Sequence, residues 1–440
     1  MEDLFRRVAE YETGKGAAYF LSLRWWTAMF GESELGLRLP SAILGSLASV
    51  AGALWAALLA QTLAHTGEER AVSRRRVLLV AGVAGVVLSL HPTLVMLGRE
   101  ARSYAFSHFF LLLSALLSVH AYLQAESRWT RGARIACPVT AALGASAHLF
   151  SLAFLIGVVL ATGAAMRARR CRFGPLAIGA AAFAVLLLTQ APLTLGHVKT
   201  TYLGGETLPT VGPRDVIHYA LDVFGGKPGV FVVGTLALWS FAFGRRDPVV
   251  RFGLVAALVA AVIAALGEAM VPTLALGGAR YLVWGAFLIP VLLAGLSGLR
   301  REHGAIAMLA LAGALAVSLV RRHDFEDRYR EDWRAASRAM ESVESHAVQI
   351  LCHRGMVVRP LRHYYRGSSP LHSCRFVGSP ESPCDCIDTA RDAIRGGRAA
   401  FLVWSHAEPW ESRREEFEAA LGPATVVHEQ YAIRVLRFGP

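Results

Sequence analysis

The chain has 440 residues, of which 54% are hydrophobic, and a formal net charge of +12. Its mean hydropathy is +0.42, and its apolar share exceeds the roughly 45–50% of ordinary soluble domains. These values argue against a soluble protein and indicate an integral membrane protein with a polar remainder. They also argue against nucleic-acid binding, because the arginines cluster in short loops between apolar runs and form no basic motif.

Residues 1–40 are mixed in composition. Within them, "GAAYFLSLRWWTAMF" (16–30) is aromatic and apolar with a single arginine. Trp and Tyr favour the membrane–water interface, so this segment is predicted to be a helix lying in that interface. "RLPSAILG" (38–45) is predicted to turn the chain into the first span.

Residues 41–320 hold about ten apolar runs, most of them close to the ~20 residues that cross a bilayer. The two runs around His148 are short, so they are either two brief spans that meet at a shallow loop or one long kinked span. The chain is polar from Arg321 to Pro440, which predicts a soluble domain over 321–440. The runs are 41–64, 77–97, 103–124, 135–147, 149–166, 175–196, 228–244, 250–268, 279–299 and 303–320.

Loop charge predicts the topology. Five arginine-rich loops alternate with loops poorer in Arg and Lys, and the positive-inside rule assigns the five to the cytoplasm. Residues 1–40 and the C-terminal domain are then extracytoplasmic. The five loops are 70–76, 127–134, 167–172, 244–247 and 299–302, and the other outward segments are 98–102, the turn near His148, 197–226 and 269–278.

An outward N-terminal segment of this length needs a way across the membrane. Residues 1–16 have no apolar core region and are therefore not a signal peptide. Either the segment is a short tail that crosses unaided, or a span precedes Met1. We expect the second.

The C-terminal domain is predicted to be a small three-layer α/β fold. Helical spacing marks 332–346, and a glycine stop ends a second helix at 388–397. The predicted strands are 347–353, 399–406 and 431–438. The chain has no GxGxxG and no phosphate loop, so no nucleotide site is expected.

Four of the six cysteines lie in this domain. An oxidising compartment favours disulfides, and four cysteines allow three pairings. Their wide spacing fits no standard zinc pattern, so disulfides or free thiols are expected rather than a metal site. The four are Cys352, Cys374, Cys384 and Cys386.

The stretch "LGREARSYAF" (97–106) places Arg99, Glu100 and Arg102 between two apolar runs, with Tyr104 just after them. One interpretation is an ion pair in the loop that faces water. The other is the rim of a site for a charged substrate, with Arg102 on a phosphate, Glu100 orienting it and Tyr104 donating a hydrogen bond. Ionisable residues close to the membrane interior usually have a function. We therefore favour the substrate site over the water-facing ion pair.

Five stretches, one of which overlaps 97–106, occur in a characteristic order along most of the chain. Together they resemble the GT-C glycosyltransferases, and among these the bacterial glycosyltransferase family 39 and dolichyl-phosphate-mannose mannosyltransferase-like proteins. Each stretch alone is a weak signal, and the ordered set is more specific. They are "YFLSLRWWTAMFGESELGLRLPSAILG" (19–45), "REARSYAF" (99–106), "GASAHLFSLAFL" (144–155), "RYLVWGAFLIP" (280–290) and "DWRAASRAM" (332–340).

This resemblance implies a multi-pass enzyme of the bacterial plasma membrane. It would move a sugar from a polyprenyl-phosphate carrier to a lipid, glycan or protein acceptor on the outer face. The family's catalytic acid, an Asp in the first outer loop, would fall before Met1, so no catalytic residue is assigned. Glu2 and Asp3 are not convincing substitutes.

The resemblance also implies substrate-binding roles for His148, Arg280 and Tyr281, beside Glu100, Arg102 and Tyr104. From the residues alone, Arg280 at a span end is equally a snorkelling anchor, and a lone His148 is as readily structural. Metal use varies among GT-C enzymes, so no cofactor is assigned and a divalent cation stays open. Lys199 and Tyr202 lie in the long outer loop, for which an ordinary solvated loop is the simpler interpretation. Glu12 and Lys15, in the segment nearest the expected acid, are weak candidates only.

Two other function classes make different demands on the sequence. A lipid or sugar transporter would place charged residues near mid-span, whereas here they lie at the outer rim. A non-catalytic GT-C-like accessory protein would follow if Met1 is the native start.

Overall fold

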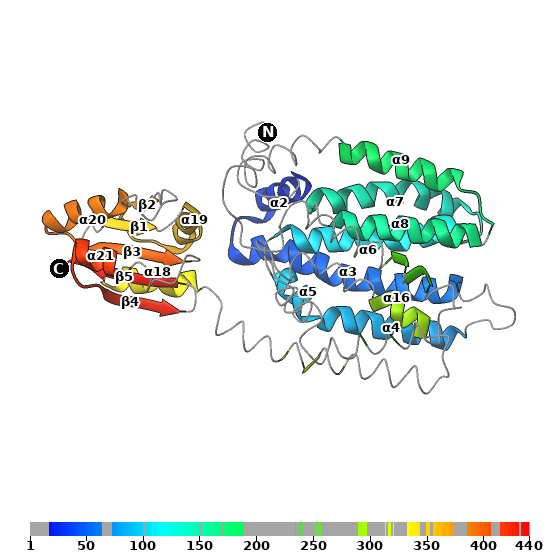
Figure 1. Cartoon of the computed structure of the whole chain (residues 1–440), viewed down its shortest axis with the longest axis horizontal. Coiled ribbons are helices and arrows are strands. Elements are labelled where there is room, and N and C mark those ends of the chain that lie inside the picture. The colour runs from blue at the N-terminus through cyan, green and yellow to red at the C-terminus, as the bar shows by residue number, and fades with distance from the viewer. Residues whose placement is uncertain are drawn as a thin grey trace. The chain divides into compact units, whose positions relative to one another are not determined.

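The structure is a computed structural model of the whole chain, shown in Figure 1. The chain divides into two compact units, Met1–Val320 and Arg321–Pro440. The structure describes residues 17–63, 73–99, 102–148, 151–168, 170–188, 289–296, 332–343, 349–352, 355–373, 385–405, 414–430 and 433–439, with a few short stretches between 234 and 320.

The first unit is a helix bundle. Helix α6 packs against α3, α7 and α8, and α3 also packs against α4. Large apolar side chains such as Trp55, Leu59, Leu88 and Leu111 are fully buried between these helices. The described helices are α2 (Ala17–Phe30), α3 (Glu34–Leu63), α4 (Arg74–Leu90), α5 (Pro92–Arg99), α6 (Ser103–Leu123), α7 (Arg128–Ala147), α8 (Ser151–Ala168), α9 (Gly174–Leu188) and α16 (Ile289–Leu296).

Within the described residues, α3, α6 and α8 are long and apolar enough to cross a membrane, and α4 with α5 makes a fourth crossing if the bent pair counts as one. The predicted run 77–97 is therefore not one straight helix, since the chain bends by 62° between α4 and α5. The predicted run 135–147 is the second half of α7, which begins earlier, at Arg128. The two runs around His148 are separate helices. Most of the predicted runs after residue 188 lie outside the described residues.

The predicted interfacial segment 16–30 is helical as α2, but the predicted turn at "RLPSAILG" is wrong. Helix α3 begins at Glu34 and continues through Pro40, so no break occurs there. Proline has no N–H and leaves the carbonyl four residues earlier without its helical donor. That carbonyl belongs to Gly36, and Trp26 Nε1 donates a hydrogen bond to it at 2.8 Å. A side chain of α2 thus replaces the missing backbone donor.

The second unit is an α/β domain. Its five strands have the order β2-β1-β3-β5-β4. Strands β2, β1 and β3 are parallel, and β5 is antiparallel to both β3 and β4. The elements are α18 (Trp333–Val343), β1 (Gln349–Cys352), α19 (Gly355–Tyr364), β2 (Leu371–Ser373), α20 (Asp385–Arg395), β3 (Ala400–Ser405), α21 (Arg414–Leu421), β4 (Thr425–Gln430) and β5 (Ile433–Phe438).

Helices cover both faces of this sheet, as a three-layer fold requires. Side chains alternate along β3, so Phe401 and Val403 pack with α18 and α19, whereas Leu402 and Trp404 pack with α20 and α21. The five elements predicted from sequence are present as α18, β1, α20, β3 and β5. Helix α20 ends at glycine as expected, because Gly397 has φ +71°. The sequence reading missed α19, α21, β2 and β4.

Candidate functional site

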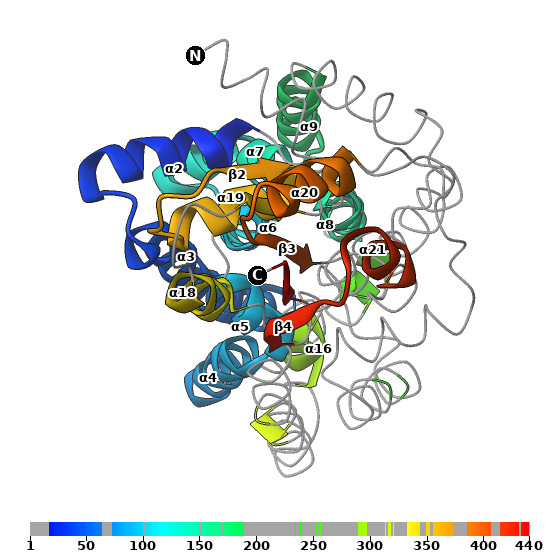
Figure 2. The same cartoon turned by 90° about the vertical axis from the view of Figure 1, so that its left-hand side faces the viewer.

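The bundle helices alternate in direction, so their ends gather into two groups (Figure 1). One group holds the junction of α4 and α5, the start of α6, the end of α7 and the start of α8. In the view along the bundle, α2 runs crosswise at the edge of this end, where it packs against α3 and α7 (Figure 2). The opposite end carries the arginine-rich starts of α4 and α7 and the arginines after α8. The topology predicted from loop charge therefore assigns the first end to the outer side.

The first end buries many polar side chains. Three are histidines, since His91, His108 and His148 expose 0%, 3% and 2% of their surface. We call this region the histidine end. Burial of polar groups in an apolar bundle costs free energy and, for ionisable residues, indicates a functional site by default. The buried hydroxyl side chains of the same helix ends are Thr93, Ser103, Ser107, Ser146 and Ser151.

Two of the sequence-predicted residues are in direct contact. The rings of Tyr104 and His148 have centroids 4.9 Å apart and planes inclined by 35°. Tyr104 lies in the first turn of α6, and His148 directly follows α7. Ser107 Oγ donates a hydrogen bond of 2.7 Å to the carbonyl oxygen of Gly144. This bond joins α6 to α7 one turn from the ring pair and so holds the two rings together.

The close approach of α6 and α7 depends on the glycine at position 144. A Cβ atom on Gly144 would lie 2.9 Å from Leu111 Cδ2 and 3.2 Å from the Leu111 backbone nitrogen. Both distances are shorter than ordinary van der Waals contact. A side chain at this position would therefore push the two helices apart and separate Tyr104 from His148.

Arg102 stands at the rim of the histidine end. It precedes α6 in extended backbone geometry, and the Ser41 hydroxyl of α3 donates to its carbonyl oxygen at 3.4 Å. Its side chain is exposed. The backbone is thus anchored while the guanidinium stays accessible, and a guanidinium fork suits a phosphate group.

His91 and His108 were missed by the sequence reading. His91 Nδ1 accepts a hydrogen bond from the Leu94 N–H at 3.4 Å. An accepting Nδ1 places the proton of a neutral ring on Nε2. His108 is buried in α6 and lies within electrostatic range of His91 and His148. The sequence could have identified His108, because it follows Tyr104 by four residues and therefore lies on the same face of α6.

The remaining sequence-predicted candidates lie outside the described residues. The structure therefore brings together Arg102, Tyr104 and His148 from the predicted set, and the others stay predictions from sequence. Among the residues that the structure describes, no group of three or more His, Cys, Asp or Glu side chains is arranged to hold a metal ion. The candidates outside the description are Glu100, Arg280, Tyr281, Glu12, Lys15, Lys199 and Tyr202.

The described part of the C-terminal domain contains one free, buried thiol at Cys352. Burial raises its pKa to about 12, against a smaller opposing effect of Arg362. The thiol is therefore protonated at neutral pH, which makes it a poor nucleophile and a poor metal ligand. Cys374 and Cys384 lie outside the described residues, so the structure does not decide their pairing.

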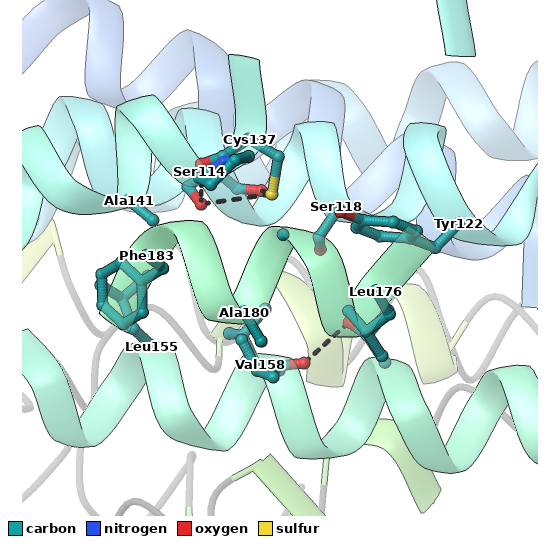
Figure 3. Close-up of a pocket in the computed structure, with 14 residues that line it drawn as sticks. Ser114, Ser118, Tyr122, Cys137, Ala141, Leu155, Val158, Leu176, Ala180 and Phe183 are labelled. Atoms are coloured by element: carbon teal, nitrogen blue, oxygen red, sulfur yellow. Dashed lines mark hydrogen bonds between the residues drawn. The ribbon is translucent and has the colours of Figure 1, made fainter. Parts of the chain in front are cut away.

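A small pocket lies between α6, α7, α8 and α9, in the half of the bundle nearer the arginine-rich end (Figure 3). Its volume of about 30 Å³ suits roughly one water molecule. Three of its hydroxyl groups donate to backbone carbonyls: Ser114 Oγ to Cys137 at 3.2 Å, Ser118 Oγ to Ala115 at 2.8 Å and Thr162 Oγ1 to Val158 at 2.7 Å. These three donors are satisfied within the protein, and the rest of the lining is mostly apolar.

Comparison with known proteins finds a similar structure but no similar sequence. No protein-family model matches the chain, and no curated protein matches it in sequence. Among solved structures, the chain is similar to the apo crystal structure of ArnT from Cupriavidus metallidurans, with a TM-score of 0.58 and 13% sequence identity. The match covers 97% of this chain and 89% of that chain. ArnT is a GT-C glycosyltransferase that transfers 4-amino-4-deoxy-L-arabinose. At this level of identity the likeness shows the fold alone, and the chain shares the overall fold of ArnT.

Proposed function

We propose that this protein is a membrane glycosyltransferase that moves a sugar from a polyprenyl-phosphate carrier to an extracytoplasmic lipid, glycan or protein acceptor. The observation that carries the proposal is the histidine end, where an exposed arginine borders a buried Tyr104–His148 ring pair. The GT-C fold shared with ArnT supports it. The apolar helices and the composition support a membrane location, which we propose to be the bacterial plasma membrane. The loop charge favours the outer side for the C-terminal domain.

The proposed chemistry requires a base, a phosphate ligand and an apolar groove. The acceptor hydroxyl attacks the anomeric carbon, the bond from that carbon to the phosphate oxygen breaks, and polyprenyl phosphate leaves. Arg102 stabilises the charge that grows on the leaving phosphate, and Tyr104 and His148 donate hydrogen bonds to the donor. Glu100, Arg280 and Tyr281 are proposed to complete the donor site. The carboxylate that accepts the hydroxyl proton is not assigned.

Binding of the carrier tests the role of Arg102. We expect Arg102→Ala to weaken polyprenyl phosphate binding about 10- to 100-fold, because a charge-assisted hydrogen bond contributes about 1.5–3 kcal/mol. Native mass spectrometry of the protein in nanodiscs measures this affinity. Arg131→Ala is the matched control, since Arg131 is exposed at the opposite end of the bundle. Equal affinities in both variants would remove Arg102 from the site.

Turnover tests the function itself. Purified protein is incubated with a polyprenyl-phosphate sugar and an extract of the source cell envelope as acceptor, and released polyprenyl phosphate is measured. We expect release by the wild type and none by Arg102→Ala or Arg280→Ala, with all proteins inserted in the membrane. A wild type that binds carrier without release would support the accessory class instead.

A further inference from the structure

The two helical layers of the C-terminal domain differ in charge. Helices α18 and α19 cover one face of the sheet, and α20 and α21 cover the other. The first layer and the turn after it expose four arginines, whereas the second layer is predominantly acidic. The four arginines are Arg334, Arg338, Arg362 and Arg366, and the acidic residues of the second layer are Asp388, Asp392, Glu415, Glu416 and Glu418.

The acids close to the four arginines are engaged by the backbone. Asp332 Oδ1 accepts a hydrogen bond of 2.8 Å from the Ala335 N–H and so caps α18. Glu341 Oε1 accepts a hydrogen bond of 2.5 Å from the Arg366 N–H. The second bond joins α18 to the chain just after α19, which gathers the arginines of both helices into one surface. We call this surface the arginine face. In the acidic layer, by contrast, Arg391 is paired with Asp388 at 2.7 Å.

Aromatic rings accompany the arginine face. The Arg334 guanidinium lies 5.6 Å from the centre of the Tyr364 ring. The rings of His363 and Tyr364 meet edge to face at 4.8 Å. Arginine together with an amphipathic aromatic ring is a combination that favours the headgroup level of a bilayer.

The chain also holds this face near a membrane. Twelve residues, 321–332, separate the end of the bundle unit at Val320 from the start of α18. Fully extended, they would span about 40 Å. Helix α18 therefore cannot move far from the bilayer that surrounds the apolar bundle.

We propose that the arginine face docks onto the anionic phospholipid headgroups of the bilayer that holds the bundle. Basic residues near an anionic surface are attracted to it within a Debye length. The acidic layer on the other side of the sheet is repelled by the same surface, so the charge asymmetry sets the orientation of the domain. This proposal does not rest on the proposed function, since it requires no sugar donor and holds for either leaflet.

Arginine labelling of the intact protein tests the docking. The wild type is placed in nanodiscs of phosphatidylglycerol or of phosphatidylcholine and treated with phenylglyoxal, and each modified arginine is quantified by mass spectrometry. We expect Arg338, Arg362 and Arg366 to react about threefold or more slowly in the anionic discs, and to recover at 0.5 M salt. Arg391 and Arg395 of the acidic layer are internal controls and should react equally in both discs.

Two charge-reversal double variants, one on each layer of the domain, test whether the arginine face itself causes the slower labelling. In Arg338→Glu/Arg362→Glu, the remaining Arg366 should lose its dependence on lipid charge, whereas Arg391→Glu/Arg395→Glu should keep it. If the first variant does not fold, the wild-type labelling still decides. Equal rates in the two lipids, or equal slowing on both layers of the domain, would overturn the proposal.

Discussion

The histidine end and the pocket between α6, α7, α8 and α9 both bury polar side chains in the same apolar bundle, yet the side chains differ in kind. In the pocket they are mainly hydroxyls, and Ser118 and Thr162 return their hydrogen bonds to carbonyls of their own helices. At the histidine end they include three imidazoles from three different helix ends, bordered by an exposed arginine. Burial of polar side chains alone therefore does not indicate a functional site. Ionisable side chains that come together from separate segments are the stronger indication.

Among changes to the buried side chains of these two regions, the largest effect is expected at His148, where a substitution can remove the imidazole nitrogens and keep an aromatic ring. In His148→Phe the stack on Tyr104 is preserved and both ring nitrogens are lost. We expect polyprenyl phosphate affinity to fall about tenfold, as for the loss of a buried hydrogen bond of about 1–2 kcal/mol. Thermal unfolding in detergent should change little. His120→Phe, on the far end of α6, is the control. Unchanged affinity in His148→Phe would show that the ring serves only packing.

A smaller effect is expected from separating the helices that carry the ring pair. Gly144→Ala places a methyl group 2.9 Å from Leu111 Cδ2, and overpacking of this kind costs about 1–3 kcal/mol. We expect a lower melting temperature together with weaker carrier binding. A variant that loses stability but keeps full affinity would argue against the α6–α7 contact as the support of the site.

The smallest effect is expected at the pocket. Gly179→Ala places a methyl group 2.5 Å from the Tyr122 hydroxyl, which is the far end of a side chain beside an empty space. Tyr122 can shift into the pocket, so we expect a stability loss under about 1 kcal/mol and unchanged carrier affinity. The melting temperature and the binding assay used for Gly144→Ala measure both. A large loss of binding here would mean that the pocket is part of the site.

The C-terminal domain shows where sequence patterns succeed. Helix α18 has a capping acid and helical spacing, β3 is largely an apolar run, and β5 combines apolar residues with two arginines, so each carries its own signal. Strand β2 has only three residues, and β4 is largely exposed, so neither shows a buried face. Helix α19 contains Pro360, which argues against a helix when the sequence is considered alone.

The helix bundle also contains a feature that local sequence patterns predict incorrectly. "RLPSAILG" reads as a turn because proline usually interrupts a helix, but Trp26 replaces the lost donor at Gly36. That compensation comes from a residue ten positions away, on another helix. No local pattern at Pro40 could have indicated it.

The sequence by itself predicts a membrane protein, a soluble domain from residue 321, a helix over 16–30 and the candidates Arg102, Tyr104 and His148, and of these the helix is confirmed as α2. Hydropathy, loop charge and residue spacing are local properties, so they can be determined from the sequence alone. Only the tertiary structure decided that Tyr104 stacks on His148, that His91 and His108 join them, and that four arginines share one face of the C-terminal domain. These groupings depend on how helix ends meet and on which side of a sheet each helix packs, and both are set by contacts between segments far apart in the chain.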